Sequence, residues 1–190
     1  GSVVAVDLDT MTTQTVWADL QSSPRGIAMF PNGDIFLAMN GPDTHIVKLD
    51  WNGVSWEHED FSGSIGSWGP GKLGVDNQDR LIVAGDSTHY VYIYDPNTGN
   101  LIDSFTHSGA GNILGLRFVD SKVYVLEIFG DRVWVGDLDT NPIQTEVILQ
   151  DSNLDYSHGL ALDNNGRLYI ANYYASKIEV YDISSGAWIE

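Results

Sequence analysis

The chain contains five histidines and no cysteine, and histidine is the side chain best suited to proton transfer near neutral pH. The absence of cysteine excludes disulfides, thiolate metal sites and cysteine nucleophiles. The histidines are scattered, without the His-Glu-x-x-His spacing of a zinc protease. Gly-x-Ser-x-Gly, phosphate-loop and dinucleotide-binding motifs are also missing from the sequence. No complete catalytic constellation is visible in the order of residues.

Residues that could do chemistry are positioned by a sequence unit that is clearest in residues 157–182. Three short apolar runs, GLAL, RLYIA and KIEVY, are separated there by DNNG and NYYAS. Val, Ile and Tyr favour strands, and Asn-Asn-Gly supplies the positive φ angles of a tight hairpin. The unit therefore predicts three antiparallel strands.

The same unit recurs three times upstream. The copies are residues 25–50, 71–95 and 114–137. The end of the second predicted strand returns at intervals of about 45 residues, at Ala38, Ala84, Leu126 and Ala171. A repeat of roughly 40–50 residues with about four strands is the signature of a β-propeller blade.

Each copy of the third predicted strand ends in aspartate, and there is a fifth copy near the N-terminus. These aspartates are Asp7, Asp50, Asp95, Asp137 and Asp182. Turn residues follow each of them, so the carboxylates are expected to accept backbone N–H bonds in Asx-turns. The chain thus begins in the middle of a blade.

The predicted fold class is all-β, a β-propeller with four complete four-stranded blades plus an N-terminal half-blade, about eighteen strands in one domain over residues 1–190. The half-blade is assigned to residues 1–20, and the complete blades to about 21–65, 66–107, 108–153 and 154–190. Innermost strands such as GIAM and GLAL are apolar on both faces, which predicts that neighbouring blades cover both sides.

The half-blade lacks inner strands, while the last repeat already carries its own third strand and a short fourth one. We therefore expect an incomplete ring, because a bare blade face would expose apolar surface and open strand edges. Either further chain or self-association with partner copies would close it.

The charge balance narrows the class of partner. Nine Lys and Arg against 26 Asp and Glu give a net charge of −17, which repels phosphate backbones and anionic membranes. No nucleic acid is expected as a partner, and no membrane insertion, since the chain has no run of about 18 apolar residues. Cations, neutral sugars and basic surfaces remain, or the charge serves solubility alone.

The phrases Gly-Ile-Ala, Pro-Asn-Gly-Asp-Ile-Phe-Leu-Ala and His-Ile-Val-Lys-Leu-Asp resemble the NHL repeat and, more loosely, the gluconolactonase, paraoxonase and strictosidine-synthase propellers. The resemblance covers nearly the whole chain and is specific for architecture, because propellers host many unrelated activities. Relatives of the gluconolactonase and paraoxonase kind hold a divalent cation in the channel through Asn, Asp and Glu. The resemblance implies calcium as the candidate metal, with Asn112, Glu127 and Asn172 as candidate ligands.

Propeller topology places the loops from fourth to first strand and from second to third strand on one face, the usual ligand face. His158 lies there as the candidate acid or base, although a structural histidine is the alternative. The candidate ligand-binding residues on this face are Arg25, Asn40, Trp68, Asp86, Phe129, Tyr173 and Tyr174. Their aromatic rings would suit a carbohydrate, a peptide side chain or another small molecule, unless they wedge between blades. The opposite loops are short hairpins, predicted to leave little room for a site.

These features favour a non-catalytic ligand-binding or protein-binding propeller module of a secreted or surface protein, in an extracellular or periplasmic location. The alternative function is a calcium-dependent hydrolase or lactonase of the gluconolactonase kind.

Overall fold

The structure is a computed structural model that describes residues 2–18, 23–40, 45–62, 69–85, 89–107, 111–154 and 156–189. These residues form eighteen β-strands in five antiparallel sheets. Within the same ranges no helix is long and apolar enough to cross a membrane. The predicted fold class, a β-propeller with a half-blade, is confirmed.

Each sheet is built from strands that follow one another in the chain. The half-blade consists of β1 (Ser2–Val6) and β2 (Thr13–Ala18). The first complete blade consists of β3 (Ser23–Met29), β4 (Ile35–Asn40), β5 (His45–Trp51) and β6 (Trp56–Ser62). The second consists of β7 (Pro70–Val75), β8 (Leu81–Gly85), β9 (Tyr90–Tyr94) and β10 (Leu101–Thr106). The third consists of β11 (Ile113–Val119), β12 (Lys122–Glu127), β13 (Arg132–Asp137) and β14 (Gln144–Gln150). The fourth consists of β15 (Ser157–Leu162), β16 (Arg167–Asn172), β17 (Lys177–Asp182) and β18 (Ala187–Ile189).

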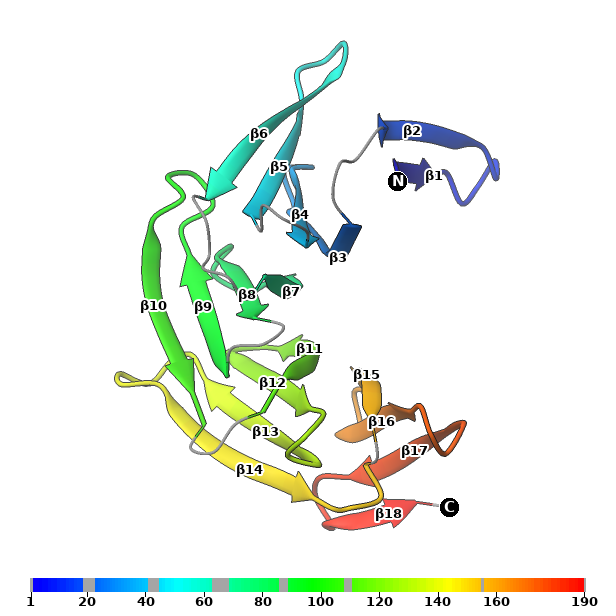
Figure 1. The fold of residues 1–190 in the computed structure, drawn as a ribbon, viewed down its shortest axis with the longest axis vertical. Helices are drawn as coiled ribbons and strands as arrows, with labels where there is room; N and C mark the ends of the chain where they lie inside the picture. The colour runs from blue at the N-terminus through cyan, green and yellow to red at the C-terminus, as the bar shows by residue number, and fades with distance from the viewer. Residues whose placement is uncertain are drawn as a thin grey trace.

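The blades are arranged in an open arc rather than a closed circle (Figure 1). The first strands of successive blades, β3, β7, β11 and β15, contact one another in that order and lie on the inner side of the arc (Figure 1). The half-blade lies at one end of the arc and the sheet β15–β18 at the other. The expected incomplete ring is therefore the observed arrangement.

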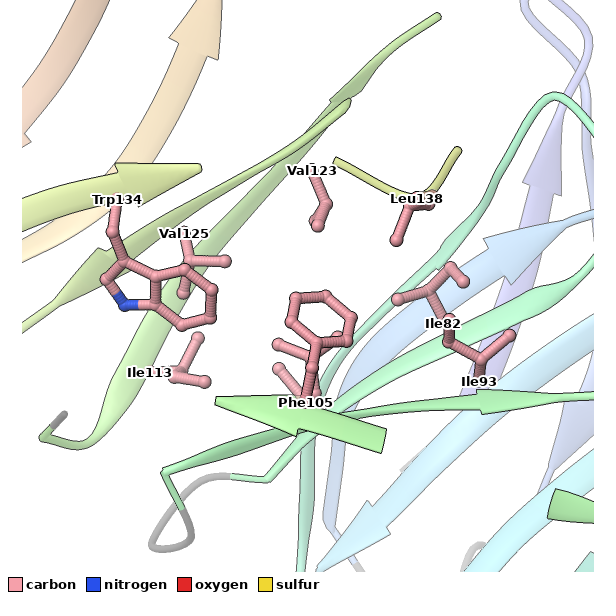
Figure 2. Close-up of a cluster of buried hydrophobic side chains, with 10 residues drawn as sticks. Ile82, Ile93, Phe105, Ile113, Val123, Val125, Trp134 and Leu138 are labelled. Atoms are coloured by element: carbon pink, nitrogen blue, oxygen red, sulfur yellow. The ribbon is translucent and has the colours of Figure 1, made fainter. Parts of the chain in front are cut away.

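The core lies between blades, because a single sheet cannot bury both of its faces by itself. Figure 2 shows the seam between the second and third blades, where Phe105 of β10 lies among side chains of β8, β9, β11, β12 and β13. Trp134 is fully buried in this seam, and its ring meets that of Phe105 edge to face with centroids 6.0 Å apart. Aromatic pairs in this geometry add about 0.5–1.5 kcal/mol beyond the area they bury.

The two ends of the arc correct one expectation. The innermost strands were predicted to be covered on both sides, but Ile27 and Met29 of β3 are 58% and 70% exposed. At the other end Ile178 of β17 is 69% exposed. The physical reason is that the first complete blade faces only the two-stranded half-blade on one side, and that no other described blade lies beyond the fourth. These apolar side chains therefore have nothing to pack against.

The aspartates that end third strands cap the following turns, with one exception. Asp7 Oδ1 accepts the N–H groups of Asp9 and Thr10 at 2.9 Å each, and Asp95, Asp137 and Asp182 make equivalent bonds. The prediction is wrong for Asp50, because β5 continues one residue further and Trp51 pairs with Trp56. Asn52 accepts the two turn N–H groups there instead, at 2.9 Å each.

Aspartates that cap turns predict acid sensitivity, and they include Asp163 after β15, which accepts the N–H groups of Asn165 and Arg167 at 2.9 Å each. Backbone N–H bonds from Thr10, Asn97 and Arg167 lower the pKa values of Asp7, Asp95 and Asp163 respectively. A lowered carboxyl pKa contributes stability that is present above the unfolded-state pKa of about 4 and is lost as the pH falls through the folded-state value. The urea concentration at the unfolding midpoint should therefore fall between pH 6 and pH 3.

The control for this prediction is Asp95→Asn, whose side-chain oxygen still accepts the turn N–H groups but does not titrate. Its unfolding midpoint should depend less steeply on pH than that of the wild type. A wild-type midpoint that stays constant over this pH range would contradict the assignment.

Candidate functional site

A β-bulge lies at the same place in the first strand of every complete blade. The register shifts between Pro24 and Gly26, Pro70 and Lys72, Ile113 and Gly115, and Ser157 and Gly159. The residues skipped by the shift are Arg25, Gly71, Leu114 and His158. Bulges re-aim side chains and occur often beside functional sites. Of the four skipped residues, Arg25 and His158 are exposed.

His158 belongs to a cluster of four aromatic rings, together with Tyr156, Tyr173 and Tyr174. The His158 ring lies 5.1 Å from that of Tyr156 and 5.5 Å from that of Tyr173, measured between centroids. Tyr174 lies 5.0 Å from Tyr156 and 5.4 Å from Tyr173. We call these four residues the aromatic cluster. The structure thus brings together three of the predicted site residues: His158, Tyr173 and Tyr174.

Tyr156 is a member of the cluster that the sequence did not single out. It lies in the loop before β15, on the predicted ligand face, but its residue type alone does not separate it from the chain's eight other tyrosines. Its φ of 55° is in the left-handed region, where a bulky residue is a real outlier held by its surroundings. Such positions gather at ligand sites.

Asn172 anchors the turn that carries Tyr173 and Tyr174. Its side-chain oxygen accepts the N–H of Ala175 at 3.2 Å, while its amide nitrogen donates to Glu179 at 3.1 Å and to the carbonyl of Asn153. The Asn172 side chain is buried. It therefore fixes the turn after β16 both to β17 and to the loop that leads into the blade.

Ser157 lies between Tyr156 and His158 and is fully buried. Among the described residues its hydroxyl has no hydrogen-bond partner. Most buried hydroxyls in proteins are paired with a protein group or an ordered water. An ordered water would satisfy this hydroxyl.

Glu127 occupies the position in β12 that corresponds to Asn172 in β16 and also acts as an anchor. Its carboxylate accepts the N–H of Gly111 at 3.0 Å, the Nε of Arg132 at 2.7 Å and the indole N–H of Trp134. Its side chain is completely buried. The anchor joins the loop before β11 to the hairpin β12–β13.

The described residues do not fit a calcium ion. Calcium takes six to eight oxygen ligands, whereas protein donors already occupy both oxygens of Glu127. Asn112 bonds to the same hairpin, through a carbonyl that accepts the N–H of Ile128 at 3.0 Å. Within the described ranges no group of three His, Cys, Asp or Glu side chains could hold a metal. A cation at Glu127 would have to displace Arg132 and Trp134.

The other predicted ligand residues are distributed over the arc. Phe129 is 70% exposed in the turn after β12, the turn that corresponds to the one carrying Tyr173. Asn40 is half-buried at the end of β4, where it pairs with Ser23. Arg25 lines a cavity beside the half-blade. Trp68 and Asp86 lie outside the described residues.

The opposite face is less closed than the short hairpins predicted. A hollow of about 500 Å³ lies there between the first and second blades, lined among others by Asn32, Asp79, Arg80 and Asn97. The short turns of the two blades extend from separate sheets, and the hollow lies between them. The presence of space for a ligand therefore does not by itself identify which of the two faces is the ligand face.

The anchor role of Glu127 can be tested by substitution. Glu127→Ala would leave Arg132 and the Trp134 N–H without their buried acceptor, and removing one partner of a buried ion pair costs about 3–5 kcal/mol. The free energy of unfolding, measured with urea, should fall by about that amount. Glu127→Gln keeps an acceptor oxygen and should lose less. A loss under about 0.5 kcal/mol for Glu127→Ala would contradict the role.

The sequence matches no protein-family model and no curated protein sequence. The structural matches are extensive. A catalytically inactive virginiamycin B lyase from Staphylococcus aureus, crystallised with quinupristin, has a TM-score of 0.76 at 16% identity, over 100% of this chain and 62% of that one. A protein from Lactobacillus plantarum has a TM-score of 0.71 at 16% identity, over 98% and 60%.

A gluconolactonase from Xanthomonas campestris has a TM-score of 0.56 at 19% identity, over 66% of this chain and 41% of that one. Identities this low support the shared propeller fold and not a shared activity. The chain spans about three fifths of the length of the Lactobacillus plantarum and Staphylococcus aureus proteins.

Proposed function

We propose that this chain is a non-catalytic binding module whose aromatic cluster holds a carbohydrate ring. The observation that carries the proposal is the cluster itself: four rings, each in contact with at least two of the others, of which Tyr173 and Tyr174 are 64% and 61% exposed. Large aromatic side chains normally contribute their area to a core. Two of them held on the surface by a buried anchor are the expected form of a recognition platform.

The chemistry of the cluster suits a sugar better than a charged ligand. Ring faces pack against the C–H groups of a pyranose, and the phenol hydroxyls and the imidazole offer hydrogen bonds to its hydroxyls. A neutral ligand is not repelled by the net charge of −17. The anchoring of the turn by Asn172 supports the proposal, because a pre-ordered platform loses less entropy on binding.

The NHL-like pattern of the repeats and an extracellular or periplasmic location belong to the same proposal. A second candidate, lactone hydrolysis of the gluconolactonase kind, is favoured by the exposed His158 at a bulge and by the fold likeness to the Xanthomonas campestris enzyme. Turnover of δ-gluconolactone by the purified protein, with and without added calcium, would distinguish an enzyme from a binding module.

The binding proposal predicts saturable binding of at least one glycan, found on a glycan array and then titrated by tyrosine fluorescence. Tyr173→Ala and Tyr174→Ala should each weaken that binding at least tenfold. Thermal unfolding should shift by only a few degrees, because both rings are mostly exposed.

The matched control is Trp51→Ala, which removes a ring that is 45% exposed in the hairpin between β5 and β6, on the opposite face. It should leave glycan binding unchanged. Binding of peptides but no glycan would reassign the ligand, and unfolding of both tyrosine variants would show that the cluster is a packing element.

A further inference from the structure

A further exposed aromatic residue lies on the ligand face, one blade away from the aromatic cluster. Phe129 is 70% exposed in the turn between β12 and β13. Propeller topology places this turn on the same face as the turn between β16 and β17, which carries Tyr173 and Tyr174. We call residues 128–131 the third-blade turn and residues 173–176 the fourth-blade turn.

A short loop, residues 151–154, is bonded to both turns. The N–H of Asp151 donates to the carbonyl of Asp131 in the third-blade turn at 2.9 Å. The carbonyl of Asn153 accepts a hydrogen bond from the side chain of Asn172, the residue before the fourth-blade turn. Asp151 and Asn153 are two positions apart, so the points at which the loop is bonded to the two turns are at most about 7 Å apart.

The loop itself is fixed in place. Asp151 Oδ1 accepts the N–H of Asn153 at 2.9 Å, and the carbonyl of Asp151 accepts the N–H of Leu154 at 3.0 Å. The indole N–H of Trp188 donates to Asp151 Oδ2 at 2.9 Å. Leu154 is fully buried in the seam between the third and fourth blades. The loop therefore keeps the two turns at a fixed spacing before any ligand binds.

The third-blade turn is anchored by Glu127, as the fourth-blade turn is anchored by Asn172. A Cβ on Gly130 would clash with a carboxylate oxygen of Glu127, so the turn lies directly against its buried anchor. The N–H of Ile128 is also bonded to the loop before β11, at 3.0 Å. Phe129 is thus an exposed ring on an ordered turn, which loses little entropy when it binds a ligand.

The two turns offer different chemistry to a sugar. The aromatic cluster has phenol hydroxyls and an imidazole beside its ring faces, so it can recognise the arrangement of hydroxyls on one sugar ring. The Phe129 ring has no polar atom and can only pack against the C–H groups of a sugar. A contact at Phe129 would therefore add affinity without selecting a particular sugar.

We propose that the ligand is a neutral oligosaccharide that spans both turns, with one sugar ring on the aromatic cluster and another on Phe129. This inference rests on the proposed carbohydrate-binding function and assigns it a ligand class, a chain of at least two sugars. The two contacts reinforce each other, because the second sugar binds from a high effective concentration once the first is bound. The net charge of −17 favours a neutral chain over an acidic one.

The experiment titrates the protein with cello-, malto- and chito-oligosaccharides of one to six units, by calorimetry and 1H–15N spectra. At least one series should bind saturably, with an affinity at least tenfold higher for the hexamer than for the monosaccharide. Phe129→Ala should abolish this gain and leave monosaccharide binding unchanged, whereas Phe129→Tyr, which keeps a ring, should retain the gain. Amide signals of the third-blade turn should shift with the hexamer alone, and those of the fourth-blade turn with both sugars.

The matched control is Trp51→Ala on the opposite face, which should bind every length as the wild type does. The inference is overturned if no series binds, if affinity does not rise with length, or if Phe129→Ala affects the monosaccharide and the hexamer equally. Should Phe129→Ala fail to fold, the amide shifts of the wild-type protein decide.

Failure of the proposed function gives a different result. If the aromatic cluster binds no carbohydrate, neither the glycan array nor any of the three series shows saturable binding. Binding that is lost in Tyr173→Ala but depends neither on chain length nor on Phe129 overturns only the two-turn assignment.

Discussion

The seam between neighbouring blades is the constraint on which the rest of this structure depends. A four-stranded sheet has two apolar faces, and here each face is buried only where another blade packs against it. The largest buried cluster draws its residues from β8, β9 and β10 on one side and from β11, β12 and β13 on the other. At the inner strands the seam is so tight that a Cβ on Gly115 would lie 3.1 Å from the Cβ of Leu160 in the next blade. Each blade is therefore stabilised by its contacts with the neighbouring blades.

The same constraint explains the two ends of the arc. The fourth blade has one described seam, and the second seam of the first blade is formed only by the two-stranded half-blade, so Ile178 and Ile27 remain exposed. The half-blade covers the outer strands of the first blade through Val3 and Val16 but leaves its innermost strand open. The cavity that Arg25 lines lies beside the half-blade, next to this innermost strand.

The repeat length and the residues at the turns predicted most of the fold, because both can be read directly from the sequence. The four blades, the half-blade and the face on which His158, Tyr173 and Tyr174 meet followed from the repeat and from propeller topology. The prediction that this strand ends at Asp50 was wrong, because Trp51 pairs with Trp56 and extends β5 by one residue. Pairing across two strands leaves no signal in the local sequence. Tyr156 was missed for a similar reason: its membership of the cluster depends on contacts with residues seventeen and eighteen positions further along the chain.

Glu127 shows most clearly why a residue type at a repeated position does not reveal its role. The residue that pairs with the one before the bulge is Met39, Gly85, Glu127 and Asn172 in the four blades, and oxygen-bearing side chains there first favoured metal binding. In the structure both polar members reach back to the loop that enters their own blade, at Gly111 and at Asn153. Each ties the turn on the ligand face to the inter-blade connection and so holds that turn in place. Apolar Met39 is buried in the core at the same position. Polar residues at this position therefore hold the turns just beyond them in place, and those variable turns carry the aromatic residues on which the binding proposal rests.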